Sequence, residues 1–300
     1  MATLRDWVSA ASDTLTANGV DPRDAAFDVE VLARHALGWT RAQWLSRLRD
    51  PLPGPPGSFA ARVEPLLARR CGREPVAQIT GVREFWGLDM AVTPDVLSPR
   101  PETELLVEIA LTKMVPHARP WAIADVGTGS GCLAVALTRE LSSARVVATD
   151  ISREALTVAE GNAARHGVAD RITFHETRFL NGVPGPYDLI VSNPPYIPDR
   201  ELTTLAPEVA HHEPRTALSG GSDGLDPARA LLPAALANLR EGGWIVMEIG
   251  AGQSDGVRRI ASQAGVVVVD ICPDLQGIPR AVIMRGATAD AGHRGAIPPE

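Results

Sequence analysis

The pattern of apolar residues changes character twice along the 300-residue chain. Over the first 75 residues it repeats at helical spacing, and one such face carries Ala25, Val29, Leu32 and Ala36. Asp21-Pro22 before this face and Thr40 with Gln43 after it are typical helix starts. The Pro- and Gly-rich stretch 51–57 must be a loop, and a further helix is predicted over 58–70. Residues 1–75 are therefore predicted to form a helical bundle.

Residues 76–100 show a different pattern. From Gly81 to Pro99 polar and apolar residues alternate, as in Phe85-Trp-Gly-Leu-Asp-Met90, which is typical of a β-hairpin. We interpret this segment as a hairpin linker between two domains.

Short apolar runs alternate with helical segments in residues 101–285. The predicted strands are 121–126, 145–149, 172–175, 187–192, 243–249, 266–271 and 280–284. The predicted helices are 102–115, 132–141, 153–166, 227–240 and 253–263. This alternation predicts an α/β fold, in which helices cover both faces of a largely parallel sheet. The small, polar residues 286–300 are expected to be a disordered tail.

The composition is typical of a globular protein in a reducing compartment. With 45% apolar and 22% charged residues, the chain resembles an ordinary globular protein, and no secretory signal or membrane-spanning stretch is recognisable. The three cysteines are scattered and form no C-x-x-C pair, which favours a reducing compartment, so we predict a cytoplasmic protein. His211 and His212 lack a third ligand at suitable spacing, and no metal site is predicted.

The formal net charge of −7 weighs against nucleic acid as the main partner. Proteins that bind DNA or RNA usually present a basic face. One stretch, residues 41–74, is basic, with seven arginines against three acidic residues. It is either a solvated helix face or a docking surface.

A glycine-rich loop follows the first strand of the predicted sheet. In Asp125-Val-Gly127-Thr-Gly129-Ser-Gly131, the glycines let the backbone turn tightly and approach a ligand. Asp150 ends the next strand, where a carboxylate can accept hydrogen bonds from both ribose hydroxyls of an adenosine. A plain turn followed by a helix-capping Asp is the alternative. The loop and the acid together favour a nucleoside cofactor.

The tetrapeptide Asn193-Pro194-Pro195-Tyr196 follows the strand 187–192, which places it at the same edge of the sheet. An amide or aryl amine nitrogen is a poor nucleophile because its lone pair is delocalised. The Asn193 side-chain oxygen and the Pro194 carbonyl can accept both N–H hydrogens and so turn the lone pair toward a methyl group. The two prolines stiffen the loop, and Tyr196 offers a flat face to a planar group. A rigid turn is the alternative, but the register with the glycine loop favours catalysis.

These two motifs resemble those of class I S-adenosylmethionine (SAM)-dependent amino-methyltransferases. Further segments resemble the PrmC/HemK family, the protein-(glutamine-N(5)) methyltransferases that act on class 1 peptide-chain release factors. The segments are 81–87, 97–104, 212–218, 220–225, 248–250 and 274–277 with Arg280. The similarity extends from the helical domain to about residue 285.

The resemblance implies a seven-stranded Rossmann-like sheet with an antiparallel edge, and an N-terminal helical bundle that binds the release factor. It implies methyl transfer from SAM to the glutamine of the factor's Gly-Gly-Gln (GGQ) motif, with S-adenosylhomocysteine as product. The SAM contacts that it assigns are Gly127, Thr128, Gly129, Ser130, Gly131, Asp150 and Asn193. Asn193, Pro194 and Tyr196 are the expected catalytic residues, and Pro195 helps them hold the glutamine amide.

One segment departs from the family. Thr177 and Arg178 stand where relatives commonly carry Asp and Trp, so an acceptor for the adenine amine is missing. Arg178 either stacks over the adenine ring or faces solvent. Phe85 and the loop 99–104 are expected to close over the active site and contact substrate, although Phe85 could equally be a core aromatic and the loop's charged residues an ion-pair cluster.

Two other functions fit parts of the pattern. Exocyclic amines of adenine or guanine in nucleic acid need the same lone-pair alignment, and a non-catalytic SAM- or nucleotide-binding protein would keep the glycine loop. The acidic charge weighs against the first and the intact Asn-Pro-Pro-Tyr against the second. The leading prediction is a release factor glutamine methyltransferase without membrane or direct nucleic-acid partners.

Overall fold

The computed structural model describes residues 3–286, and these residues form two compact units. One unit comprises residues 3–82 and 205–213, and the other comprises 83–204 and 214–286. The tail expected over 286–300 lies, apart from residue 286, outside the described residues.

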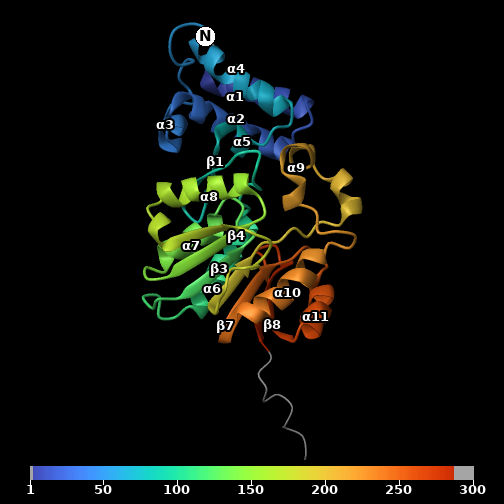
Figure 1. The fold of residues 1–300 in the computed structure, drawn as a ribbon. Coiled ribbons are helices and arrows are strands. Elements are labelled where there is room, and N and C mark those ends of the chain that lie inside the picture. The colour runs from blue at the N-terminus through green and yellow to red at the C-terminus, as the bar shows by residue number, and fades with distance from the viewer. Residues whose placement is uncertain (1–2, 287–300) are drawn as a thin grey trace, which may run out of the picture. The chain divides into compact units, whose positions relative to one another are not determined.

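The first unit is helical (Figure 1), as the sequence pattern predicts for residues 1–75. Its helices are α1 (Leu4–Ala17), α2 (Pro22–Leu37), α3 (Arg41–Ser46), α4 (Ser58–Cys71), α5 (Val76–Thr80) and α9 (Pro207–His212). The predicted helix starts are confirmed: Asp21 caps α2, and Thr40 with Gln43 forms the capping box of α3. Trp44, Phe59 and other apolar side chains on the inward faces are buried against one another.

Helix α9 is distant in sequence from the other helices of this unit, and ion pairs bind it to them. The buried Arg70 of α4 contacts Asp28 of α2 at 2.7 Å and Glu208 of α9 at 2.9 Å. Arg73 contacts the other carboxylate oxygen of Glu208 at 2.7 Å. These ion pairs satisfy charges that burial would otherwise make costly.

The second unit begins with the predicted hairpin. Strands β1 (Val82–Phe85) and β2 (Leu88–Ala91) pair as a two-stranded sheet. The two residues between them, Trp86 and Gly87, have φ of +55° and +69°. Positive φ at both central residues is what a tight hairpin turn requires.

A seven-stranded sheet forms the centre of the second unit. Its strands are β3 (Ala122–Val126), β4 (Arg145–Asp150), β5 (Ile172–Glu176), β6 (Tyr187–Ser192), β7 (Leu239–Glu248), β8 (Val266–Pro273) and β9 (Pro279–Gly286). Their spatial order is β5-β4-β3-β6-β7-β9-β8, and only β9 is antiparallel to its neighbours. The predicted α/β fold with an antiparallel edge is confirmed. The strand order reverses between β3 and β6, which is where open sheets of this type bind ligands.

Helices cover both faces of this sheet (Figure 1). The helices of this unit are η1 (Pro101–Thr103), α6 (Glu104–Lys113), α7 (Cys132–Glu140), α8 (Arg153–Arg165), η2 (Ala169–Arg171), η3 (Asp199–Thr204), η4 (Arg215–Ala217), α10 (Asp226–Asn238) and α11 (Ser254–Gln263). Successive residues of β3 alternate between the faces: Ile123 packs with α6 and α7, and Ala124 with α10 and α11. The strands are therefore apolar on both sides, which explains their continuous apolar runs.

Five short helices, α5, η2, η3, α9 and η4, were not predicted, because they have too few residues for a helical period to be visible. Helix α5 occupies the start of the segment 76–100 that was expected to be a hairpin linker, so the hairpin begins only at Val82. Among the described residues, no helix combines the length and the apolar character needed to cross a membrane.

Candidate active site

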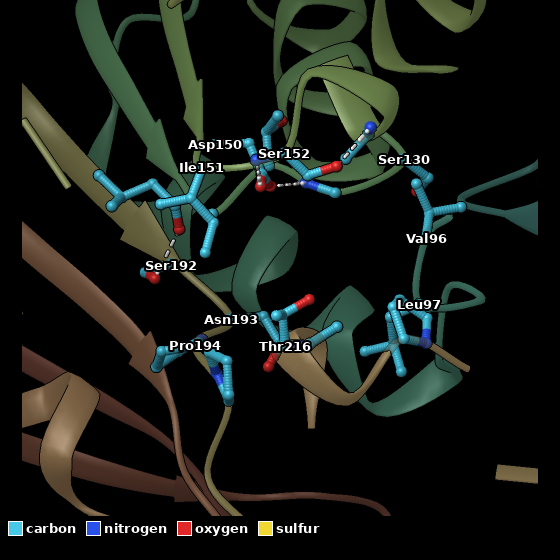
Figure 2. Close-up of a pocket in the computed structure, with 18 of the residues that line it drawn as sticks. Val96, Leu97, Ser130, Asp150, Ile151, Ser152, Ser192, Asn193, Pro194 and Thr216 are labelled. Carbon is cyan, nitrogen blue, oxygen red and sulfur yellow. Dashed lines mark hydrogen bonds between the residues drawn. The ribbon is translucent and has the colours of Figure 1, made fainter. Parts of the chain in front are cut away.

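A cavity of about 570 Å³ opens at the carboxyl ends of β3, β4 and β6. This volume is typical of sites for small ligands. The glycine loop after β3 and Asp150 at the end of β4 line one side of it, and the residues after β6 line another. Figure 2 shows Ser130, Asp150 and Ser152 facing the cavity from one side and Asn193 and Pro194 from the other, with Leu97 and Thr216 completing the wall.

Backbone hydrogen bonds fix the glycine loop to the neighbouring strand. The N–H groups of Gly127 and Thr128 both donate to the Thr149 carbonyl, at 2.8 and 2.9 Å. Gly127 and Gly129 have φ of +72° and +54°, and a Cβ on either would meet no atom within 4 Å. Their Cα atoms thus border open space, where a ligand can approach the backbone closely.

Gly131 is required for a different reason. It also has a positive φ, +79°, but a Cβ there would lie 2.9 Å from the Cβ of Ala159 in α8. This glycine lets helix α7 begin in contact with α8, whereas Gly127 and Gly129 keep the cavity wall open.

The Asp150 carboxylate is held in place and keeps acceptor capacity. Its Oδ2 accepts from the Gly129 N–H at 2.9 Å and its Oδ1 from the Ser152 N–H at 3.0 Å. Each carboxylate oxygen can accept a second hydrogen bond. Beneath the loop, the buried Asp125 accepts from the Thr128 hydroxyl at 2.6 Å and from the Ala134 N–H at 3.1 Å, and burial raises its pKa to about 7.

The Asn193 side chain is the start of a buried chain of hydrogen bonds. Its Nδ2 donates to Thr103 Oγ1 at 3.0 Å, and the Thr103 hydroxyl donates to Glu248 Oε2 at 2.7 Å. The Tyr196 hydroxyl donates to the other oxygen, Oε1, at 3.3 Å. Thr103 and Glu248 are each 2% exposed, and burial raises the pKa of Glu248 to about 7. Burial next to this carboxyl also raises the pKa of Tyr196.

The backbone of the tetrapeptide is fixed on both sides. Just before it, the Ser192 hydroxyl donates to the Val126 carbonyl at 2.7 Å, which ties β6 to the end of β3. Just after it, Gln253 Nε2 donates to the Tyr196 carbonyl at 2.8 Å, and the Ile197 N–H donates to Leu218 at 3.0 Å. Asn193 and Pro194 therefore face the cavity from a rigid frame.

Two family models match the chain: the PrmC N-terminal domain over residues 6–81 and the methyltransferase small domain over residues 102–223. The release factor glutamine methyltransferase of Cereibacter sphaeroides is 46% identical over 281 residues, covering 93% of this chain and 97% of the relative. That of Geobacter sulfurreducens is 43% identical over 281 residues, covering 93% and 95%. The chain belongs to the family of release factor glutamine methyltransferases.

Membership confirms the resemblance stated from the sequence and makes the protein a methyltransferase of class I. A solved structure with this fold is the hMettl16 catalytic domain in complex with a MAT2A 3′UTR hairpin, with a TM-score of 0.56. It is 18% identical in sequence and covers 72% of this chain and 81% of that domain, a likeness of fold alone.

The methyltransferase brings most of the predicted site residues to one cavity. The predicted residues that line it are Gly127, Thr128, Gly129, Ser130, Asp150, Arg178, Asn193, Pro194 and Pro195. Gly131 lies at the start of α7, against α8. Arg178 is exposed, and its guanidinium lies 5.5 Å from the centre of the Phe179 ring. Its role toward adenine stays a prediction.

Besides Gly131, two predicted residues do not line this cavity. Phe85 is 1% exposed and packs in the core with Met90 and Leu106. It is therefore a core aromatic, and the expectation that it closes over the active site is wrong. Tyr196 does not line the cavity. It lines a smaller cleft together with Glu248 and Gln253, because its hydroxyl points to the buried carboxyl of Glu248. Of the loop 99–104, Pro99, Arg100 and Thr103 do line the cavity.

The sequence assigned no role to Thr103 or Glu248. Both lie in segments that resemble the family, but they are 145 residues apart, and no spacing pattern pairs them. Within residues 3–286, no group of three or more His, Cys, Asp or Glu side chains could hold a metal ion.

Proposed function

We propose that this enzyme transfers a methyl group from SAM to the side-chain amide nitrogen of the glutamine in the GGQ motif of class 1 peptide-chain release factors. The observation that carries the proposal is the Asn193 amide at the cavity wall. Its Nδ2 is bound to Thr103, and its Oδ1 has no hydrogen-bond partner among the described residues. A hydrogen-bond acceptor on a rigid frame therefore stands beside the glycine loop.

The side of the cavity formed by the glycine loop and Asp150 fits SAM. The open surfaces of Gly127 and Gly129 let a ligand lie against the backbone, and the Asp150 oxygens can accept from ribose hydroxyls. When bound, SAM supplies a methyl group on an electrophilic sulfonium. Fixing this group and the amide nitrogen at short range lowers the entropic part of the barrier.

In this proposal Asn193 Oδ1 and the Pro194 carbonyl accept the two N–H hydrogens of the glutamine amide. Pro194 and Pro195 contribute no N–H of their own and have fixed φ, so the edge they form is stiff and carries acceptors. The two hydrogen bonds hold the amide plane so that the nitrogen lone pair faces the methyl group. No strong base is needed at this position.

The release factor is the partner in this proposal, and the helical unit is its docking element. Relatives named release factor glutamine methyltransferase share 40–46% identity with the chain in most cases, and they support this substrate over an exocyclic amine of nucleic acid. The cytoplasm, where translation takes place, is the compartment that the proposal requires.

Incubation with labelled SAM and a purified release factor tests the substrate. We expect one methyl group on the GGQ peptide by mass spectrometry, and none when its glutamine is replaced by alanine. Label that persists on the alanine variant of the release factor would contradict the proposal.

Asn193→Ala tests the chemistry. It removes an acceptor that acts on the glutamine, so turnover should fall by roughly 100-fold while the Kd for SAM changes by less than about threefold. Single-turnover kinetics and calorimetric titration of SAM measure the two quantities. A variant that loses SAM affinity but turns over at the wild-type rate when saturated would assign Asn193 to the cofactor instead.

A further inference from the structure

Two buried polar residues stand directly behind the Asn193 amide. Thr103 lies in the short helix η1 and Glu248 at the end of β7, and each is 2% exposed. The distances from Asn193 Nδ2 to Thr103 Oγ1 and from Thr103 Oγ1 to Glu248 Oε2 are 3.0 and 2.7 Å. The three side chains therefore form one continuous path of hydrogen bonds from the cavity wall into the core.

The chemistry of these groups fixes the direction of each hydrogen bond. A threonine hydroxyl has one proton, and while the Glu248 carboxyl is ionised it can only accept, so the Thr103 proton is given to it. The Thr103 oxygen can then only accept, so the end of the Asn193 amide that faces it must be the NH₂ group. The amide oxygen is consequently the end left for the cavity.

This constraint matters because the two ends of a carboxamide are nearly the same in shape. Without a partner that distinguishes oxygen from nitrogen, the Asn193 amide could rotate by half a turn within the same space. The flipped amide would present N–H groups to the N–H groups of the substrate, and the acceptor would be lost.

We propose that Thr103 and Glu248 are positioning residues for methyl transfer, which fix the Asn193 amide with its oxygen toward the substrate nitrogen. The inference rests on the proposed glutamine substrate for its kinetic consequence only. The orientation of the amide is a property of the enzyme by itself and can be measured without substrate.

The surroundings of Glu248 agree with a fixed acceptor. The Tyr196 hydroxyl donates to its second oxygen at 3.3 Å, while the Thr103 hydroxyl occupies the first. Both carboxyl oxygens are thus engaged, and the carboxyl cannot turn away from Thr103 without breaking a second hydrogen bond.

Three variants test the proposal. Thr103→Val keeps the shape and removes the hydroxyl, and Thr103→Ser keeps the hydroxyl. Thr138→Val is the matched control: Thr138 is fully buried in the same unit, and its hydroxyl donates to the Ala134 carbonyl within its own helix. We expect Thr103→Val to lower kcat by roughly 10–100-fold with the Kd for SAM changed by less than about threefold. Thr103→Ser and Thr138→Val should stay near wild type.

A double variant separates positioning from simple damage. If Thr103 acts through Asn193, Thr103→Val should lower kcat no further in an Asn193→Ala background. Equal losses in both backgrounds would overturn the proposal, because the effect would then not pass through Asn193. A kcat of Thr103→Val equal to that of the wild type would overturn it as well.

The orientation itself is read from the side-chain NH₂ signals of Asn193 by nitrogen-15 NMR, assigned from their loss in Asn193→Ala. We expect one proton of this amide to be protected from exchange in the wild type, in Thr103→Ser and in Thr138→Val, but not in Thr103→Val. Unchanged signals in Thr103→Val would overturn the proposal whatever the substrate. A changed signal in an enzyme that labels no release factor would uphold the positioning role and reject the substrate.

Discussion

Replacing Gly131 by alanine should destabilise the fold through two separate effects. The residue has a φ of +79°, and a left-handed conformation costs a non-glycine residue about 1–2 kcal/mol. The new Cβ would lie 2.9 Å from the Cβ and 3.1 Å from the Cα of Ala159, atoms that cannot rotate away, and overpacking of this kind costs about 1–3 kcal/mol. We therefore expect the free energy of unfolding to fall by roughly 2–5 kcal/mol.

Gly127→Ala is the matched control, because it shares the first effect and lacks the second. Its φ is +72°, and a Cβ there meets no atom within 4 Å. We expect a loss of only about 1–2 kcal/mol in stability. The methyl group would, however, occupy the cavity wall assigned to SAM, so the Kd for SAM should rise by about tenfold or more, which corresponds to about 1.4 kcal/mol.

Urea unfolding followed by tryptophan fluorescence, together with calorimetric titration of SAM, measures both quantities for both variants. Equal losses of stability in the two variants would refute the argument that α7 and α8 require a glycine at their contact. Wild-type SAM affinity in Gly127→Ala would refute the assignment of the loop to the cofactor.

Two further predictions concern buried charges. Arg70→Met should lower the free energy of unfolding by about 3–5 kcal/mol, because Asp28 loses its ion-pair partner and Glu208 keeps only Arg73. Urea unfolding measures this loss, and a value under about 1 kcal/mol would contradict the prediction. Burial raises the pKa of Glu248 to about 7. Between about pH 4.5 and 7 the folded enzyme therefore holds a proton that the unfolded chain has released, and the free energy of unfolding should fall by about 3 kcal/mol as the pH rises through this range. Glu248→Gln should remove this part of the decline, and an unchanged pH profile would show that the carboxyl does not titrate there.

The sequence predicts the fold of the second unit well because its central strands are buried on both faces. Residues such as Ile123 and Ala124 of β3 pack on opposite faces, so central strands such as β3 and β6 are mostly apolar. The glycine loop, Asp150 and Asn193 could be placed together for a related reason. Each follows a parallel strand, and the carboxyl ends of parallel strands lie at one edge of the sheet.

Contacts between distant segments could not be predicted in this way. Glu208 lies in a six-residue helix whose sequence contains nothing to indicate that Arg70 and Arg73 bind it. Tyr196 shows the same limit within the site: its place in the tetrapeptide favoured contact with the substrate, but the buried carboxyl of Glu248 attracts its hydroxyl. Neither partner can be identified by periodicity, since the pairing depends on side-chain reach across the fold.

The residue that faces the substrate, Asn193, is neutral, and the nearest carboxyl behind it belongs to Glu248. A carboxylate at the place of Asn193 would accept a substrate N–H more strongly than an amide does, but it would also stabilise a neighbouring sulfonium most before transfer, when the positive charge is still on sulfur. Stabilising the ground state more than the transition state slows a reaction. Asn193 presents a neutral acceptor to the cavity, and the carboxyl of Glu248 stands one hydroxyl further back, hydrogen-bonded through Thr103. We infer that this arrangement gives the amide a fixed direction without placing a charge against the cofactor, so Asn193→Asp should bind SAM at least as tightly as the wild type and still transfer methyl more slowly.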